Sequence, residues 1–391
     1  MTLARPIVLA IGLLAGCKAK KAQEAQPIVA RDASVVVTLD AAVDDAPELA
    51  GYPRVDAERT VTIPATKARG DEVGPVIAND LAIVGGTAFG FAAIDVRRGG
   101  IAWTKPAGAH VAPPLVHGTS IVLVGECERY VPVPDGELLL GCVRVVTTTG
   151  SDEAFMPVHG KRSEVEAFAA SAGAQALWGA GETAVRWRKG NEAVTIDLLD
   201  GAARRASSEP PPLAITYQGT RWDIAQREGR IVARGKRPWQ TEHAYTAVLG
   251  TVWTAEGAPL VRVLDLGAYA GTPEAHLIDI DAGGSMRATV ARPTPGVALL
   301  GHGVSARGDA AIALRGSSGR DFVVGYAANA LLVYVHALPR STRVRAHVGV
   351  AVAPDAVVVF HDGDRVTILP ELSAPPTAPG ATSSASQNPT P

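Results

Sequence analysis

The body of the chain, from about Gly51 to Leu372, predicts an all-β fold. Short apolar runs follow one another along this stretch, and most are bounded by Gly, Pro, Asp or Asn, which is typical of short strands joined by turns. Long helical periodicity is nearly absent. The apolar content of 47%, rich in Val and Ala, is sufficient for a large core.

The clearest strands are expected in runs of branched and aliphatic residues. These runs are Ala82–Val84, Ile121–Val124, Val143–Val146, Ala311–Leu314, Leu331–Tyr334 and Val357–Phe360. A helix is an alternative at Ser163 to Leu177, because this stretch is Ala-rich and opens with Ser163 and Glu166 at the spacing of a capping box.

One segment carries a motif whose spacing describes a strand, a turn and a second strand. Ala93 and Asp95 end an apolar run, Gly99 lies at a tight turn, and Trp103 lies on the following strand. The pattern A-x-D-x-x-x-G-K-x-x-W resembles the tryptophan-docking motif of the pyrroloquinoline-quinone-like β-propeller family, with Gly100 in place of the Lys. The resemblance implies that the Trp packs between neighbouring blades and that the Asp side chain braces the turn.

Weaker copies of the motif recur along the chain. They begin at Asp197, at Asp279 and, with an aromatic in place of the Asp, at Tyr326. Their intervals suit one or two blades at a period of about 40 to 50 residues, which is the range of propeller repeats. The sequence therefore predicts a β-propeller of four-stranded antiparallel blades, about seven in number, with six or eight as alternatives.

The first and last parts of the body suggest how the ring closes. The final segment, Val348 to Leu369, is one strand short of a blade, and Arg54 to Pro64 precedes the first blade with an alternating pattern. We expect this N-terminal strand to complete the last blade, because an open sheet edge invites aggregation.

The N-terminus carries a segment typical of an export signal. Leu14, Ala15, Gly16 and Cys17 close a short apolar stretch and resemble the lipobox of bacterial lipoprotein signal peptides. The resemblance implies cleavage after Gly16 and a lipid on Cys17, which anchors the protein to a membrane without spanning it. The alternative is an ordinary secretory signal.

The predicted organisation has four parts. Residues 1–16 form the signal peptide, and residues 17–50, without sustained periodicity, form a flexible tether. Residues 51–372 form the propeller. Residues 373–391 form a disordered tail of Pro, Ser, Thr and Ala.

Cys127 and Cys142 are an even pair in a chain predicted to be exported, so a disulfide is expected. They flank the turn sequence Pro134 to Glu137, and strands from Ile121 to Val131 and from Leu138 to Val146 would place the thiols opposite each other. This hairpin is longer than a blade needs. It is either a projecting recognition element or an insertion without a binding role.

Charge and motifs exclude several classes of function. The 37 Lys and Arg balance 39 Asp and Glu, so no nucleic-acid partner is expected. Quinone-binding members of the resembled family commonly carry adjacent cysteines and a calcium-binding carboxylate set, and neither pattern occurs here. The nine histidines are dispersed, without the close spacing of a compact metal site. We expect no cofactor and no metal.

The sequence thus predicts a non-enzymatic, lipid-anchored binding or scaffold module of the bacterial cell envelope, at the outer membrane rather than the inner one. The architecture is similar to that of propeller lipoproteins of outer-membrane β-barrel assembly. The expected partner is a protein or glycan. The alternative is an envelope enzyme, a hydrolase or quinone-type oxidoreductase, with its site at the propeller channel.

Overall fold

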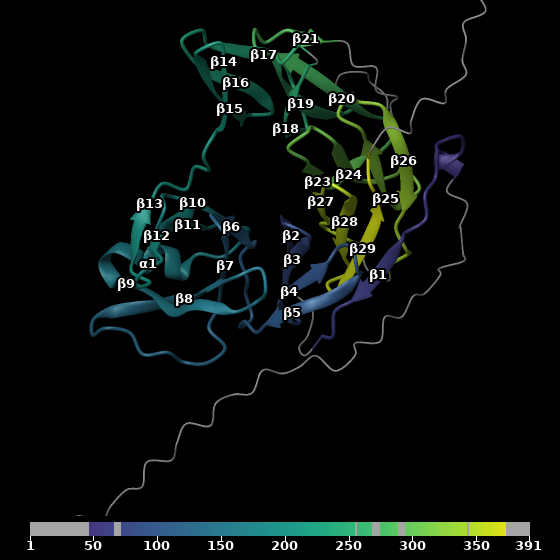
Figure 1. Ribbon diagram of the computed structural model, residues 1–391. Coiled ribbons are helices and arrows are strands. Elements are labelled where there is room, and N and C mark those ends of the chain that lie inside the picture. The colour runs from purple at the N-terminus through teal and green to yellow at the C-terminus, as the bar shows by residue number, and fades with distance from the viewer. Residues whose placement is uncertain are drawn as a thin grey trace, which may run out of the picture. The chain divides into compact units, whose positions relative to one another are not determined.

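The structure is a computed structural model that describes residues 47–65, 72–254, 256–267, 274–287, 294–341 and 344–372 (Figure 1). The predicted signal peptide, Cys17, most of the predicted tether and the predicted tail lie outside these residues. Within the described ranges no helix is long and apolar enough to cross a membrane.

Seven antiparallel sheets account for nearly all of the described chain. The first three blades are consecutive in sequence. Blade 1 comprises β2 (Glu72–Ala78), β3 (Leu81–Gly86), β4 (Gly90–Asp95) and β5 (Gly100–Lys105). Blade 2 comprises β6 (Leu115–His117), β7 (Ser120–Gly125), β8 (Glu137–Val146) and β9 (Asp152–Lys161). Blade 3 comprises β10 (Gln175–Gly179), β11 (Ala184–Lys189), β12 (Glu192–Asp197) and β13 (Ala203–Ala206).

The remaining blades follow in the same order. Blade 4 comprises β14 (Leu213–Tyr217), β15 (Thr220–Arg227), β16 (Arg230–Gly235) and β17 (Trp239–Ala244). Blade 5 comprises β18 (Ala247–Trp253), β19 (Pro259–Leu266), β20 (Glu274–Asp281) and β21 (Met286–Arg287), with the short β22 (Thr294–Pro295) also paired to β20. Blade 6 comprises β23 (Ala298–Val304), β24 (Ala310–Arg315), β25 (Asp321–Tyr326) and β26 (Leu332–Ala337).

Blade 7 confirms the predicted closure. Its strands β27 (Gly349–Val352), β28 (Ala356–His361) and β29 (Arg365–Pro370) are joined by β1 (Arg59–Thr62), so the sheet order is β1-β29-β28-β27. Val61 of β1 lies opposite Val366 of β29. A 3₁₀ turn, η1 (Pro47–Leu49), precedes β1. The fold is a seven-bladed β-propeller.

The core lies between neighbouring blades. Strands such as β24 and β28 are buried almost throughout, because both faces of a middle strand pack against adjacent blades. This is why they read in the sequence as continuous apolar runs. One core cluster, for example, joins Ala82 and Ile94 of blade 1 to Val358 and Phe360 of blade 7, and the Phe89 and Phe360 rings meet edge-on at 6.1 Å.

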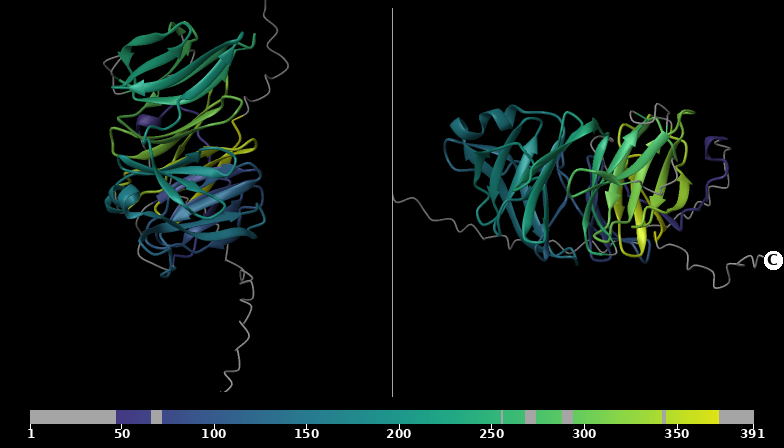
Figure 2. Two further views of the ribbon diagram at one scale, coloured as in Figure 1. Left: turned by 90° about the vertical axis from the view of Figure 1, so that its left-hand side faces the viewer. Right: turned by 90° about the horizontal axis from the view of Figure 1, so that it is seen from above.

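The helical stretch is shorter than the sequence suggested. The helix α1 (Arg162–Ala170) begins after Lys161, with no side-chain hydrogen bond at its N-terminus, so the capping box does not form. It ends at Ala170, because the backbone of the next residue, Ser171, is already extended with φ −77° and ψ 141°. Val165 and Phe168 bury its inner face against blades 2 and 3, on the periphery of the sheets (Figure 2).

Candidate functional site

The docking-motif residues lie at the junction of blades 1 and 2. Ala93 is buried in β4, and the Asp95 carboxylate accepts a hydrogen bond from the Arg98 backbone N–H at 2.8 Å, which holds the turn to β5. Gly99 has a φ of +68° in that turn. Trp103 is half-buried on β5, and its Nε1–H donates to the Thr148 carbonyl of blade 2 at 3.0 Å.

The Trp103 ring lies against Gly150, whose φ is +82°, in the turn that joins the third and fourth strands of blade 2. The same contact recurs between blades 4 and 5, where the Trp239 ring covers Gly284 with a φ of +84°. A Cβ at either glycine would collide with the indole or lie unusually close to it. Both tryptophans therefore act in packing.

A cavity of about 830 Å³ lies against the inner strands of blades 1, 2, 3, 6 and 7, and we call it the channel cavity. Its wall is mostly apolar, with Pro75, Val111, Leu140 and Val350 among the lining residues. Polar side chains interrupt this wall at a few positions. They are Glu72, His110, Glu126, Ser171, Gln175, Lys189, His302 and His347.

His302 and His347 reach the channel cavity from adjacent blades. His302 lies on β23 of blade 6, and His347 lies just before β27 of blade 7. Burial lowers the pKa of both imidazoles, and the neighbouring His347 lowers that of His302 further. Both side chains are therefore neutral at pH 7, and each offers one donor and one acceptor to a ligand.

Lys189 occupies the blade 3 side of the same cavity. Its Nζ lies 4.6 Å from the centre of the Phe168 ring and 4.8 Å from that of the Trp187 ring, which favours the charged ammonium. Burial lowers the pKa of Lys189, and the Glu126 carboxylate opposes that change. The cavity thus combines an apolar wall with a cation and two neutral histidines, a composition suited to a small ligand.

No group of three or more His, Cys, Asp or Glu side chains able to hold a metal occurs among the described residues.

The structure joins Cys127 and Cys142 in a disulfide, with 5.0 Å between their Cα atoms. The strand before it is shorter than predicted, because β7 ends at Gly125 and not at Val131. The chain from 126 to 136 is therefore a loop, which we call the hairpin loop, fastened to β8 by the bridge. Tyr130 in this loop is 80% exposed.

A second cavity, of about 400 Å³, opens beside the hairpin loop, and we call it the hairpin groove. Its wall includes Arg144 of β8 and Phe155 of β9, and the Arg144 guanidinium lies 4.7 Å from the centre of the Phe155 ring. Asp152 pairs with Arg144 at 2.8 Å and with Lys105 at 3.0 Å. Burial alone would raise the pKa of Asp152, but hydrogen bonds from these two cations lower it.

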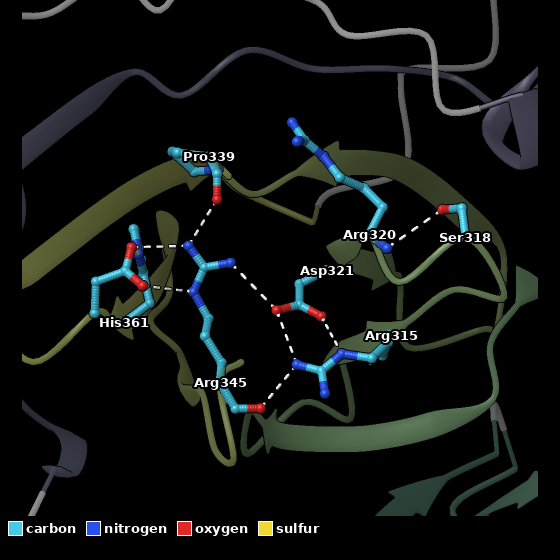
Figure 3. Close-up of polar contacts among 8 residues, drawn as sticks. Arg315, Ser318, Arg320, Asp321, Pro339, Arg345 and His361 are labelled. Atoms are coloured by element: carbon cyan, nitrogen blue, oxygen red, sulfur yellow. Dashed lines mark hydrogen bonds and ion pairs between the residues drawn. The ribbon is translucent and has the colours of Figure 1, made fainter. Parts of the chain in front are cut away.

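A buried network of charges joins blades 6 and 7 (Figure 3). The Arg345 guanidinium binds Asp362 through Nε and Nη2, both at 2.8 Å, and Asp321 through Nη1 at 3.2 Å. Arg315 donates to the other oxygen of Asp321 at 2.8 Å. Burial would raise the pKa of Asp362, but His361 and Arg345 hold it far below the usual range.

His361 completes this network and is wholly buried. One ring nitrogen contacts Asp362 at 2.9 Å, and the other contacts the Thr367 hydroxyl at 2.8 Å. Burial lowers its pKa. Because both nitrogens are already bonded, we interpret His361 as a structural histidine.

Two of the sites are assembled from residues that no sequence pattern connects. His302, His347 and Lys189 come from three blades, and only the fold brings them to one cavity. Arg144 and Phe155 of the hairpin groove lie on neighbouring strands, where they read as ordinary strand residues. The paired cysteines were the one available signal for the groove.

No protein-family model matches the chain, and no curated protein matches it. Solved structures of similar fold include virginiamycin B lyase from Staphylococcus aureus, 11% identical, with a TM-score of 0.46 over 80% of this chain and 98% of that one. The β-propeller domain of Cps50 (Swd1) from Myceliophteria thermophila is 12% identical, with a TM-score of 0.43 over 78% and 99%. BamB from Moraxella catarrhalis is 12% identical, with a TM-score of 0.33 over 76% and 84%. At these identities the likenesses say nothing of function.

Proposed function

We propose that the protein is a lipid-anchored scaffold of the bacterial cell envelope, at the outer membrane, whose propeller binds a partner protein at the hairpin loop and groove. The lipobox resemblance at Leu14 to Cys17 supports the anchor. The disulfide supports export, because such bonds persist in oxidising compartments. A propeller supplies a rigid surface and needs no catalytic residues for this role.

The exposed aromatic side chains beside the disulfide carry the proposal. Tyr130 in the hairpin loop is 80% exposed, and Phe155, whose ring lies 4.7 Å from the Arg144 guanidinium, is 49% exposed. Tyr and Arg are the residue types that dominate the energy of protein interfaces. The Cys127–Cys142 bridge restrains the hairpin loop before binding, which lowers the entropy cost of association.

The test is quantitative recovery of partner proteins by the intact, membrane-extracted protein. Tyr130→Ala should weaken binding of the specific partner about thirtyfold and reduce its recovery accordingly, because an aromatic anchor contributes roughly 2 kcal/mol. Trp253→Ala is the matched control, since Trp253 is an aromatic residue 50% exposed on β18, away from the hairpin loop. Equal recovery by the wild type and Tyr130→Ala would reject the docking site.

The anchor has its own test. Mass spectrometry of the extracted protein should find an acylated N-terminal Cys17, and Cys17→Ser should release the protein from membranes. A peptide that runs unbroken through Gly16 and an unmodified Cys17 would reject lipidation.

The channel cavity favours a second candidate function, an envelope enzyme or small-molecule receptor. Its two neutral histidines and Lys189 are groups that could orient or protonate a bound substrate. A metabolite library screened by thermal shift tests this alternative. A ligand that stabilises the wild type and fails to stabilise His302→Ala would favour it over the scaffold.

A further inference from the structure

One face of blade 3 carries arginines in place of the apolar residues that pack between most neighbouring blades. Strand β11 alternates, so Val185 and Trp187 face the core shared with blade 2, and Arg186 and Arg188 face the other way. The register places Arg186 beside Trp178 of β10 and Thr195 of β12. Arg204 of β13 lies next to Thr195 in the same row. We call the surface made by Trp178, Arg186, Arg188 and Arg204 the arginine face.

The arginines of this face have no acidic partner among the described residues. Arg186, Arg188 and Arg204 form no ion pair there, and the Nε atoms of Arg186 and Arg188 are buried without a hydrogen-bond acceptor. The acidic side chain on the same face, Asp197, accepts the Leu199 backbone N–H at 2.9 Å. A guanidinium that lacks acceptors for its N–H groups costs free energy, so a ligand that supplies acceptors to the remaining N–H groups of these arginines is favoured here.

Blade 4, which follows in the chain, also carries arginines on the face turned away from its core. Its apolar side chains, Ile224 and Ala233 among them, pack toward blade 5. The opposite face carries Arg221 and Arg234, with Asp223 paired to Arg221 at 3.0 Å. The consecutive blades 3 and 4 therefore both turn a cationic face away from their cores.

The spacing of the arginines identifies the kind of ligand. Arg186 and Arg188 lie two residues apart on a strand, so their Cα atoms are separated by about 7 Å. Carboxylates at alternate positions of an extended peptide have the same separation, and each can bind a guanidinium through two oxygens. The Trp178 ring beside Arg186 adds an apolar surface for the residues between them.

We propose that the arginine face binds an extended segment of a partner protein in which Asp or Glu occupies alternate positions. This goes beyond the proposed scaffold function, because it assigns a second surface and the chemistry of what binds there. The hairpin loop and groove take no part in it. Binding weakens with salt, because salt screens the attraction between charges at the protein surface.

The experiment measures fluorescence polarisation of a labelled peptide that alternates Glu with Thr, titrated with the full chain at low ionic strength. The expected result is saturable binding, with no binding of the peptide in which Gln replaces each Glu. Arg186→Gln combined with Arg188→Gln should raise the Kd at least about tenfold, because two charge-assisted interactions are lost.

Matched variants separate this face from general charge. Arg54→Gln combined with Arg365→Gln removes the same charge at other exposed positions and should change the Kd less than about twofold. Arg204→Gln alters an exposed side chain, so it should keep the fold and still weaken binding about threefold even if the double variant is unstable. Tyr130→Ala should leave the Kd unchanged, which distinguishes this proposal from the proposed function.

Three outcomes overturn the proposal. The first is equal binding of the Glu peptide by the wild type and by Arg186→Gln/Arg188→Gln. The second is tight binding of dextran sulfate that displaces the peptide and depends on the same arginines, which would assign the face to a polyanionic glycan. The third is a dimer in sedimentation that only the arginine variant dissociates, which would assign the face to a second copy of the chain.

Discussion

At the scale of single residues, three junctions between blades contain a large side chain that covers a glycine with positive φ. Trp103 over Gly150 and Trp239 over Gly284 are two instances. Arg59 of β1 makes the corresponding contact with Gly99 of blade 1 and donates to the Arg97 carbonyl. The side chain varies, but the backbone conformation that it requires of the neighbouring turn is the same.

Trp103→Ala should lower the free energy of unfolding by about 2 to 3 kcal/mol. The value falls below the roughly 3 to 5 kcal/mol of a fully buried aromatic, because Trp103 is only half-buried. Trp103→Phe keeps most of the packing and loses the bond to Thr148, so it should cost about 1 kcal/mol. Urea denaturation measures both. An unchanged midpoint for Trp103→Ala would contradict the docking role.

Acid should destabilise the protein partly through His361. Because burial lowers the pKa of His361, its imidazole takes up a proton less readily in the folded protein than in the unfolded chain. The free energy of unfolding therefore falls as pH drops below about 6.5, by up to roughly 1.4 kcal/mol per pH unit for each such histidine. Asp362, whose pKa is lowered, adds a further loss below about pH 4.

The check is the thermal midpoint of His361→Gln between pH 8 and pH 5. The variant should be less stable than the wild type at pH 8, because it loses hydrogen bonds, and its midpoint should fall less steeply toward pH 5. The midpoint of the variant should still fall to some extent toward pH 5, because burial also lowers the pKa values of three other histidines, His336, His302 and His347. The exposed His243→Gln serves as the control and should keep the full slope. A His361→Gln profile parallel to the wild type would refute the assignment.

Sequence patterns reached some functional residues and missed others for a physical reason. The motif from Ala93 to Trp103 is local, because one turn and two adjacent strands contain all of it. His302 and His347 meet only after blades 6 and 7 pack together, so no local spacing could have paired them.

At the scale of strands and helices, burial on both faces explains what the sequence revealed. Runs such as Val357 to Phe360 are apolar throughout because blade 7 packs between two neighbours. Strand β11 differs, since Val185 and Trp187 alternate with Arg186 and Arg188, which is typical of a strand with one face in the core. That alternation was the available signal for the arginine face. Strand β7 was predicted too long, because the prediction extended the pairing past Cys127 to Val131, whereas the last residue of β7 paired with β8 is Gly125.

Loss of the disulfide should destabilise blade 2. Cys127 and Cys142 are 15 residues apart, so the chain-entropy model assigns the bridge up to about 3 kcal/mol. Cys127→Ala combined with Cys142→Ala should lower the denaturation midpoint accordingly. The freed hairpin loop should also become accessible to trypsin after Arg129.

The reduced wild type provides the control, since it should show the same cleavage without any substitution. A double variant with an unchanged midpoint and an uncut loop would show that the bridge restrains nothing. In that case the contacts of the hairpin loop with the residues that line the hairpin groove would be sufficient to hold the loop.

At the scale of the whole molecule, the number of blades and the manner of closure could be predicted. Both follow from positions along the whole sequence: the interval between repeats gives the number of blades, and the missing strand of the last blade gives the closure. Which surfaces bind could not be predicted. The channel cavity and the arginine face depend on which side of each strand turns inward, and the packing of neighbouring blades decides that.

Closure by β1 is the feature on which the stability of the whole fold should depend. Val61 is 5% exposed and packs with Val358 and Val366 of blade 7, whereas the next residue, Thr62, is exposed on the opposite face of the strand. Val61→Asp should bury an unpaired carboxylate, detach β1 from β29 and cost about 3 to 4 kcal/mol. Thr62→Asp, a matched change at the exposed position, should stay within about 0.5 kcal/mol. Because detachment exposes the edge of β29, the Val61→Asp protein should also form oligomers with rising concentration in size-exclusion chromatography. A monomeric Val61→Asp protein with the midpoint of Thr62→Asp would mean that the propeller is stable without its N-terminal strand.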